Sequence, residues 1–271
     1  MNILENNYMG YNLFSGKLTD FPKLPKLLIN TINQYSFCAA EEDKDFKKAL
    51  LDSDVLLPDG IGIVLALKAT SGESIKKISG SDLHQHLLTE LNKNRGKCFY
   101  LGSSEITLNK IKERLHLDFP DINCQSFSPP FKEVFSDDEN AEMIRRINCF
   151  KPDVLFIGMT APKQEKWAND QKSKIDSKLI CTIGAVFDFF AGTVKRPSDF
   201  WINMKLEWFV RLCKEPKRMW KRYLYYGPIF MYILLKEKIR IDLVHGNQAI
   251  NGFQKNTEDL NGLSNSYSHK H

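Results

Sequence analysis

The residues from Asp153 to Trp167 have the pattern of a phosphate-binding turn. A short apolar run ends at Gly158, Thr160 is a suitable helix cap, and Pro162 suits a first helical turn. A helix start presents unpaired N–H groups and the positive end of the helix dipole, so it favours an anion. Lys163 would place a cation against that dipole, which predicts that Pro162 and Lys163 bind a phosphate group. The alternative is an ordinary strand-to-helix turn with a surface lysine.

Two aspartates follow apolar runs that we expect to be buried strands. Asp59 comes just after residues 55–57, and a carboxylate at such a strand end can have a raised pKa and act as a general base. Asp188 follows residues 179–184 and could accept hydrogen bonds from a nucleotide base or ribose. The alternative for both aspartates is a helix cap.

Three further motifs argue against a metal or a nicotinamide cofactor. Residues 52–54 (Asp-Ser-Asp) match a D-x-D metal pattern, but they precede the strand at 55–57, and a metal pair is needed after it. His84 and His86 are two apart in a predicted helix, so their side chains diverge. Residues 60–62 (Gly-Ile-Gly) lack the third glycine of a dinucleotide fingerprint. We therefore expect no metal site and no cofactor.

A basic cluster near the C-terminus is a second candidate phosphate site. Arg218 and Arg222 are four residues apart on one face of a predicted helix, and Lys221 is adjacent. Guanidinium groups match phosphate oxygens with paired hydrogen bonds, so this cluster could bind a diphosphate without a metal. The alternatives are a solvated basic face and a face attracted only to anionic lipid.

The elements that must position these residues alternate between strand and helix patterns. Strands are predicted at 27–33, 55–57, 98–102, 122–127, 154–157 and 179–184, and helices at 39–51, 61–69, 81–94, 104–118, 138–150, from 160, and 185–191. This alternation predicts an α/β fold with a mostly parallel, Rossmann-like sheet and helices on both faces. Right-handed crossovers would bring the strand ends to one edge, where ligands bind in such sheets. Residues 1–25 give no clear pattern.

The chain changes character after Pro197. Helices are predicted at 199–213 and from Pro216, and residues 227–228 (Gly-Pro) are expected to kink or break the second one. The net charge of the chain is +5, yet residues 195–240 contain twelve Lys and Arg against four Asp and Glu. Such a segment indicates an anionic partner, which could be a membrane surface, a nucleic acid or a phosphorylated ligand.

Residues 223–235 carry no charge. They are too short to cross a bilayer, which takes about 20 residues. Their aromatic and basic flanks fit a helix that lies at the membrane surface, and the alternative is a last helix packed on the core. We therefore divide the chain into an α/β catalytic domain (1–194), a helical, membrane-associating appendage that completes the active site (195–243) and a disordered tail (244–271).

The cysteines indicate a reducing compartment. The six are scattered, and none forms a C-x-x-C pair, which fits reduced thiols in a cytosolic protein. The first residues have no basic region followed by an apolar one, so no secretory signal is predicted.

Six ordered motifs resemble those of the WecG/TagA/CpsF family of bacterial glycosyltransferases. They fall within about residues 26–224 and are Leu57–Val64, Ser79–Leu83, Gly158–Glu165, Ile183–Asp188, Leu206–Leu212 and Glu215–Leu224. The resemblance implies an inverting, metal-independent enzyme that moves a sugar from a UDP-sugar to a polyprenyl-diphosphate-linked saccharide. The sugar would be of the N-acetylmannosamine type or another hexose, and the products would be exopolysaccharide, teichoic acid or similar surface polymers. The implied location is the cytoplasmic face of the cell membrane, as a peripheral protein on an anionic surface, with a homo-oligomer as a further expectation.

The resemblance also implies roles for particular residues. Asp59 matches the base that deprotonates the acceptor hydroxyl, and the catalytic set matched by motif is Asp59, Thr31, Arg211 and Arg218. The residues expected to bind substrate are Asn33, Gly60, Pro162, Lys163, Gln164, Asp188, Lys221 and Arg222. Lys77 and Lys221 stand where the family commonly has arginine, and a lysine keeps the charge but loses bidentate geometry.

Two other classes of function remain open at this point. One is a UDP-sugar-binding membrane adaptor without chemistry, although binding alone does not require a base at position 59. The other is a nucleic-acid binder that uses the basic, aromatic segment. The apolar run at 223–235 favours lipid, so we expect no nucleic-acid partner.

Overall fold

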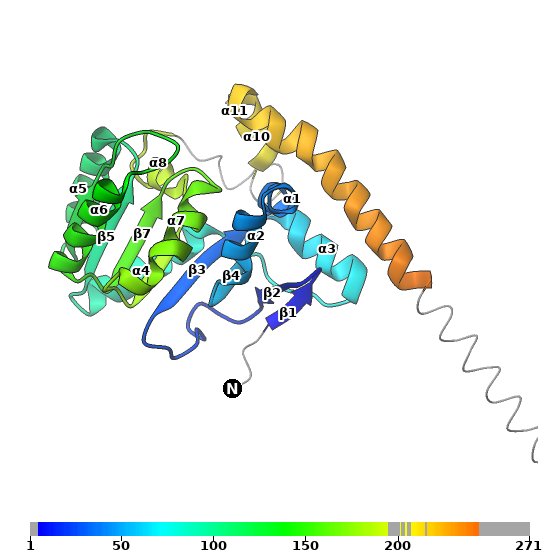
Figure 1. The fold of residues 1–271 in the computed structure, drawn as a ribbon, viewed down its shortest axis with the longest axis horizontal. Coiled ribbons are helices and arrows are strands. Elements are labelled where there is room, and N and C mark those ends of the chain that lie inside the picture. The colour runs from blue at the N-terminus through cyan, green and yellow to red at the C-terminus, as the bar shows by residue number, and fades with distance from the viewer. Residues whose placement is uncertain (1–4, 195–200, 202–203, 205–206, 215, 244–271) are drawn as a thin grey trace, which may run out of the picture.

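The computed structural model describes residues 5–194, 201, 204, 207–214 and 216–243 (Figure 1). The strands are β1 (Glu5–Tyr8), β2 (Tyr11–Phe14), β3 (Leu27–Ile32), β4 (Val55–Pro58), β5 (Lys97–Gly102), β6 (Asn123–Phe127), β7 (Val154–Gly158) and β8 (Leu179–Thr182). They form one sheet with the order β1-β2-β4-β3-β8-β7-β5-β6. Neighbouring strands from β2 to β6 pair in parallel, and β1 pairs with β2 in antiparallel fashion. The predicted Rossmann-like sheet is confirmed.

The helices connect these strands and largely follow the sequence pattern. They are α1 (Gln34–Glu42), α2 (Lys44–Leu51), α3 (Ile61–Ser71), α4 (Gly80–Lys93), α5 (Glu105–Asp118), α6 (Asp137–Phe150), α7 (Lys163–Gln171), the short η1 (Lys172–Lys174) and α8 (Val186–Phe190). Ser79, Ser104 and Ser136 accept hydrogen bonds from backbone N–H groups in the first turns of α4, α5 and α6. These caps explain why the three helices begin where the sequence predicts.

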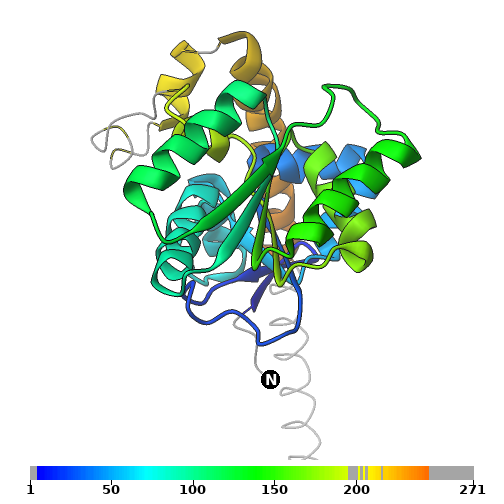
Figure 2. The ribbon, with the colours of Figure 1, turned by 90° about the vertical axis from the view of Figure 1, so that its left-hand side faces the viewer.

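Helices cover both faces of the sheet (Figure 2). Successive strand residues point to opposite faces, so Tyr100 and Phe156 pack in the cluster with α4, α5 and α8. Their neighbours Phe99 and Leu155 pack in the cluster with α6 and α7. Because β4, β5, β7 and β8 are buried on both faces over most of their length, their sequences are largely apolar runs rather than alternating ones, whereas the edge strand β6 is partly exposed and more polar.

Two parts of the N-terminal half differ from the sequence prediction. The single helix expected at 39–51 is two helices, because Asp43 ends α1 and its side chain caps α2 through the N–H groups of Asp45 and Phe46. The unassigned N-terminal residues form the β1–β2 hairpin, which extends the sheet beyond β4.

The C-terminal segment consists of α10 (Glu207–Lys214), α11 (Pro216–Trp220), the π-helical turn η2 (Lys221–Tyr225) and a helix over residues 226–243. The expected break at residues 227–228 is wrong, since the helix continues through them and the irregular turn precedes them. Pro228 lies shortly after the π-helical turn η2, and the helix continues through it although proline has no N–H to donate. Of the helix expected at 199–213, most of residues 199–206 lie outside the described residues and the remainder belongs to α10. The whole tail from residue 244 also lies outside the described residues.

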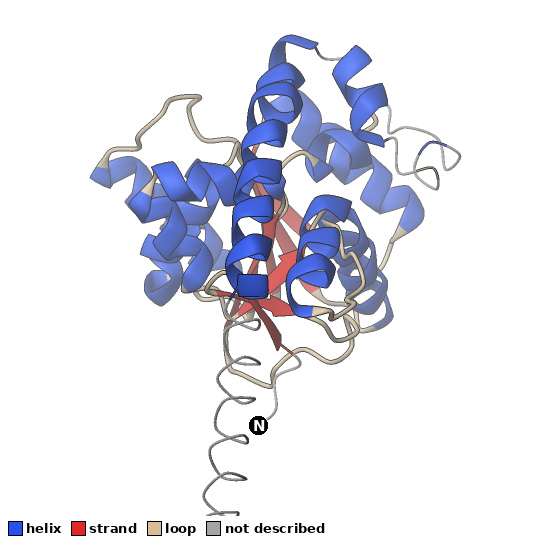
Figure 3. Ribbon diagram, turned by 90° about the vertical axis from the view of Figure 1, so that its right-hand side faces the viewer, coloured by secondary structure: helices blue, strands red, loops and turns tan. Residues whose placement is uncertain are grey.

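The helix over residues 226–243 packs along the body of the protein (Figure 3). Tyr226 and Phe230 are buried in a cluster with side chains of α1, α3 and the β1–β2 hairpin. The opposite side of the same segment leaves large apolar side chains exposed, namely Leu224, Tyr225, Met231, Tyr232, Leu235, Ile239 and Leu243. The helix is therefore packed on the core along one side and exposes apolar surface along the other. Among the described residues, no helix is long and apolar enough to cross a membrane.

Candidate active site

A cavity of about 980 Å³ opens at the edge of the sheet where the parallel strands end. Its walls come from the segments that follow β3 to β8 and from Arg222 of the C-terminal segment. The predicted site residues that it brings together are Thr31, Asn33, Asp59, Lys163, Gln164, Asp188 and Arg222. The predicted residues Gly60, Pro162 and Lys221 do not line it. The side chains of Arg211 and Arg218, in α10 and α11, lie outside the described part of the chain.

Asp59 and Thr31 occupy the ends of two neighbouring strands. Thr31 pairs with Leu57 across β3 and β4, and the Asp59 N–H donates to the carbonyl oxygen of Ile32 over 2.8 Å. That bond fixes the turn after β4 against the end of β3. Asp59 is partly exposed in the cavity wall, where its carboxylate can meet a ligand.

Asn33 and Gly60 shape this part of the wall. The side-chain oxygen of Asn33 accepts from the N–H groups of Tyr35 and Ser36, both over 3.0 Å, and so caps α1. Gly60 has φ +122, and a Cβ there would lie 3.2 Å from the Gln34 side-chain oxygen. Glycine is therefore required at the start of α3 by backbone conformation and by the close approach of α1.

The turn after β7 differs from the predicted helix start. Thr160 does not cap α7; its carbonyl oxygen accepts from Lys163 N–H over 3.0 Å in a preceding turn. The Ala161–Pro162 peptide bond is cis, and Pro162 stands at the cap position without a side-chain hydrogen bond. The helical ladder begins with Lys166 N–H donating to Pro162 O over 3.2 Å. Pro162 therefore stands just before the first residue of α7, Lys163, and not inside its first turn.

Lys163 is engaged with the loop between β6 and α6. Its ammonium group donates to the carbonyl oxygen of Lys132 and lies 3.6 Å from the centroid of the Phe135 ring. Burial lowers the pKa of Lys163, and the nearby Glu139 carboxylate acts in the opposite direction. The lysine therefore ties the 128–136 loop to α7 beside the cavity, and its predicted contact with a phosphate stays a prediction.

Gln164 and Glu165 are polar but buried in the cavity wall, with 4% and 2% of their surfaces exposed. Gln164 Oε1 accepts from Met159 N–H over 3.2 Å, and its Nε2 donates to Glu165 Oε1 over 2.8 Å. Burial raises the pKa of Glu165 to about 7, against the lowering effects of the Gln164 hydrogen bond and the Arg222 charge. The site thus contains a buried carboxyl group whose pKa is raised above the ordinary value of a glutamate.

Asp188 lines the cavity from α8. Its carbonyl oxygen accepts from the Thr193 hydroxyl over 3.1 Å and from Val194 N–H over 3.2 Å. The Thr193 hydroxyl also lies 3.5 Å from Asp188 Oδ1. These contacts hold the residues after α8 against the helix while the Asp188 carboxylate remains in the cavity wall.

Arg222 brings the C-terminal segment to the cavity. Its guanidinium lies 4.6 Å from the centroid of the Tyr35 ring, which lines the same cavity from α1. Lys221 is exposed, and its ammonium group lies 5.9 Å from the Tyr226 ring centroid. The structure therefore separates the predicted pair: Arg222 lines the cavity, and Lys221 lies on the surface beside it.

Sequence reasoning assigned no role to several residues of the cavity wall, among them Tyr35, Lys77, Ser103, Ser104, Phe131 and Glu165. The sequence could have indicated Lys77 and Glu165 as site residues, since both lie in or beside the family motifs. Phe131, at the tip of the 128–136 loop, is fully exposed. The sequence feature that pointed to Phe131 was the preceding Pro129-Pro130 pair. Such a pair predicts a loop but does not show that the loop borders a cavity.

The D-x-D motif lies away from the cavity, as its place before β4 predicted. Asp54 Oδ2 accepts from Leu28 N–H over 2.6 Å and pairs with the Lys172 ammonium group over 2.7 Å. His84 is buried, and its Nε2 lies 2.7 Å from the Tyr100 hydroxyl. The described residues contain no group of three or more His, Cys, Asp or Glu that could hold a metal ion.

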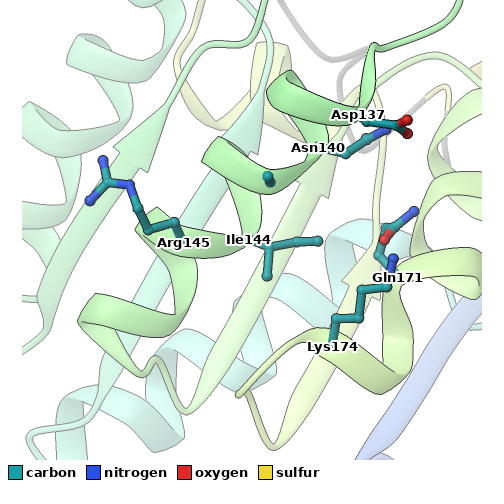
Figure 4. A pocket seen from close by; sticks show the side chains of 7 residues that line it. Asp137, Asn140, Ile144, Arg145, Gln171 and Lys174 are labelled. Atoms are coloured by element: carbon teal, nitrogen blue, oxygen red, sulfur yellow. The ribbon is translucent and has the colours of Figure 1, made fainter.

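A second hollow of about 480 Å³ lies between α6 and the end of α7 (Figure 4). Its walls include Asn140, Arg145 and Gln171. The Gln171 side-chain oxygen is buried without a hydrogen-bond partner among the described residues. None of the predicted site residues lines this hollow.

A doubly wound α/β sheet with a cavity at its strand ends, lined by polar and apolar side chains, is typical of proteins that bind nucleotide-linked or phosphorylated ligands at this edge. Within that class, the chain belongs to the glycosyl transferase WecG/TagA/CpsF family, whose model matches residues 17–243. It is a glycosyltransferase, and the family resemblance found in the sequence is confirmed.

Named relatives show the same family. A protein of Bacillus subtilis (strain 168) is 31% identical over 211 residues, covering 78% of this chain and 80% of its own. Proteins of Bacillus spizizenii (29% identical; 68% and 70% covered) and Staphylococcus aureus strain MW2 (28%; 79% and 82%) are also similar. All three are named N-acetylglucosaminyldiphosphoundecaprenol N-acetyl-beta-D-mannosaminyltransferase.

Proposed function

We propose that this enzyme transfers an N-acetylmannosamine residue, or a closely related hexose, from a UDP-sugar to a saccharide linked to a polyprenyl diphosphate. The observation that carries the proposal is the convergence of Asp59, Gln164, Asp188 and Arg222 on one cavity at the strand ends. The names of the relatives supply the sugar and the class of acceptor.

The proposed reaction is a single inverting displacement. Asp59 takes the proton of the acceptor hydroxyl, whose oxygen attacks the anomeric carbon of the donor. The bond from that carbon to the phosphate oxygen breaks, and UDP leaves from the opposite face. A beta-linked product, as in the names of the relatives, follows from an alpha-linked donor by such an inversion.

Basic residues are proposed to balance the charge that develops on the leaving diphosphate. Arg222 is already in the cavity wall, and Arg211, Arg218 and Lys221 belong to the same segment. Gln164 and Asp188 are proposed to contact the nucleotide. Metal independence is a part of the proposal that chelation tests directly.

The C-terminal segment is proposed to hold the enzyme on an anionic membrane surface, at the cytoplasmic face, where the acceptor lipid lies. Its support is the exposed apolar side of residues 224–243, together with exposed Trp208, Phe209 and Trp220. Such a surface with basic neighbours fits a helix in the interface. Self-association remains a further prediction.

The test measures UDP release from a panel of UDP-sugars in EDTA, with and without polyprenyl-diphosphate-linked N-acetylglucosamine. We expect acceptor-dependent release from UDP-N-acetylmannosamine. Release that requires a divalent cation would overturn metal independence alone. UDP binding without transfer to any acceptor would overturn the proposed reaction and favour the adaptor.

A further inference from the structure

We propose that Glu165 is a positioning residue of the transfer site, which holds the side-chain amide of Gln164 in one orientation. This inference rests on the proposed function, because the orientation of the Gln164 amide matters to catalysis only if this amide contacts the UDP-sugar. Glu165 itself is argued to act through Gln164 and not by touching the reacting atoms.

The amide of Gln164 is held from two sides. Met159 N–H donates to its oxygen over 3.2 Å, and its nitrogen donates to Glu165 Oε1 over 2.8 Å. The reversed amide would place N–H against N–H and oxygen against a carboxyl oxygen, so the two partners together select one orientation. Gly184 lies beside this amide, since a Cβ at that position would be in ordinary van der Waals contact with Gln164 Nε2, at 3.4 Å.

This orientation decides what Gln164 offers to a ligand. A primary amide has two N–H donors and two acceptor positions, and the two internal bonds use one of each. The second N–H therefore has a defined direction in the wall of the cavity that Gln164 lines. An N–H group at a fixed position is suited to donate a hydrogen bond to a phosphate oxygen of a nucleoside diphosphate. A freely rotating amide would bind less well, because it would lose conformational entropy on binding.

Glu165 has the burial expected of a fixed support rather than of a direct ligand contact. Only 2% of its surface is exposed, and its Oε2 is fully enclosed without a hydrogen-bond partner among the described residues. An unmet buried carboxyl oxygen is costly, so folding stability alone does not explain an acid at this position. An apolar side chain of similar size would fill the same space at lower cost.

Glu165 and Arg222 line the same cavity, although they come from α7 and from the C-terminal segment. Arg222 is 57 residues further along the chain, and its charge acts on Glu165 in the sense that favours the carboxylate. Arg222 also lies on Tyr35, so its guanidinium is held at the cavity. The wall of one cavity thus contains side chains of the α7 turn, which is part of the α/β body, and of the C-terminal segment.

The experiment compares KM for the UDP-sugar and kcat in the full-length wild type, E165Q and E165L. Glutamine at 165 keeps an oxygen that can accept from Gln164 Nε2, so E165Q is expected to stay within about threefold of wild type in both parameters. Leucine removes the acceptor, so E165L is expected to raise the donor KM about tenfold, which corresponds to the loss of one well-placed hydrogen bond. Its kcat should change much less, and UDP affinity measured by calorimetry should fall by a similar factor as the KM rises.

Two controls separate positioning from general damage. Q171L removes a polar side chain from the same helix at the hollow remote from the cavity, and it should leave KM and kcat unchanged. In a Q164L background, E165L should add no further loss, because the group that it positions is already gone. If E165L does not fold, E165A carries the same comparison.

Equal KM values for E165L and wild type would overturn this inference and leave the proposed function standing. Equal impairment of E165Q and E165L would also overturn it, because the hydrogen bond would then not be the cause. A wild-type protein that neither binds UDP nor transfers a sugar would overturn the proposed function, and this inference with it.

Discussion

The guanidinium of Arg222 lies 4.6 Å from the centroid of the Tyr35 ring. The two residues belong to η2 and α1, and both line the cavity at the strand ends. Tyr226 extends the contact, since its ring centroid lies 5.3 Å from that of Tyr35 and its hydroxyl donates to Glu42 over 2.9 Å. The C-terminal segment is thus attached to the α/β body at the cavity itself.

Removal of the Tyr35 ring should therefore weaken catalysis without unfolding the protein. A cation–π contact contributes about 0.5–2 kcal/mol, so Y35L is expected to lower kcat/KM roughly 2- to 30-fold. Y35F keeps the ring and should remain close to wild type. Steady-state kinetics check this, and an equal loss in Y35L and Y35F would show that the hydroxyl, not the ring, is what matters.

Asp59 should be indispensable for turnover but not for donor binding. D59N removes the proposed base while keeping the shape of the side chain, so the transfer rate is expected to fall roughly 10²- to 10⁴-fold. UDP affinity should stay near the wild-type value. D52N is the matched control, because Asp52 lies before β4, outside the cavity, and should have no effect on the rate. Near-normal turnover by D59N would exclude Asp59 as the base.

Phe230 should determine whether the helix over residues 226–243 stays packed on the body. Its ring is buried, with its centroid 5.6 Å from that of Phe37, and F230A is expected to cost about 3–5 kcal/mol of packing energy. Hydrogen exchange in residues 226–243 should then become faster in F230A. Y232A changes an exposed ring on the same helix and should leave exchange slow. Unchanged exchange in F230A would mean that other contacts hold the helix.

His84 should make the fold sensitive to acid. Burial, assisted by the charge of Arg114, lowers the pKa of His84 to about 3. In the unfolded chain, the His84 imidazole binds a proton near pH 6.5. As the pH falls, this histidine is therefore protonated in the unfolded state before it is protonated in the folded state. The folded state loses stability over the interval from pH 6.5 to 3 as a result. From pH 6.5 to 5 this amounts to about 2 kcal/mol.

Urea denaturation at these two pH values measures that loss. H84Q keeps a donor for the Tyr100 hydroxyl but does not titrate. Its free energy of unfolding should fall by about 2 kcal/mol less than that of wild type over the same pH interval. The same fall in both proteins would show that other groups account for the acid sensitivity.

The strand pattern and the family motifs were sufficient to predict the sheet and most of the cavity. Asp59, Gln164 and Asp188 follow buried strands, and parallel pairing brings the ends of those strands together. The chemistry of the individual side chains was harder to predict. The sequence shows that Lys163 follows Pro162, but not that Lys132 and Phe135 lie within its reach.

The elements that the sequence did not predict depend on contacts between distant segments. β1 and β2 have four residues each and no apolar period, and their place is set by Tyr8 and Tyr11 packing on Phe37. The helix over residues 226–243 has apolar residues on two sides, so its pattern fits membrane contact and core packing equally. Only the fold shows which side faces the protein.

One consequence concerns the order in which the protein can be completed during synthesis. Tyr8, Tyr11, Phe37 and Phe230 belong to one buried cluster, so the first and the last described elements of the chain share a core. Until residue 230 has left the ribosome, the aromatic rings of the N-terminal hairpin in the nascent chain lack part of their packing partners. The buried cluster beside α1 and α3 is therefore the last part of the core to be completed during synthesis. A chain truncated near its C-terminus would expose apolar surface at its N-terminal hairpin.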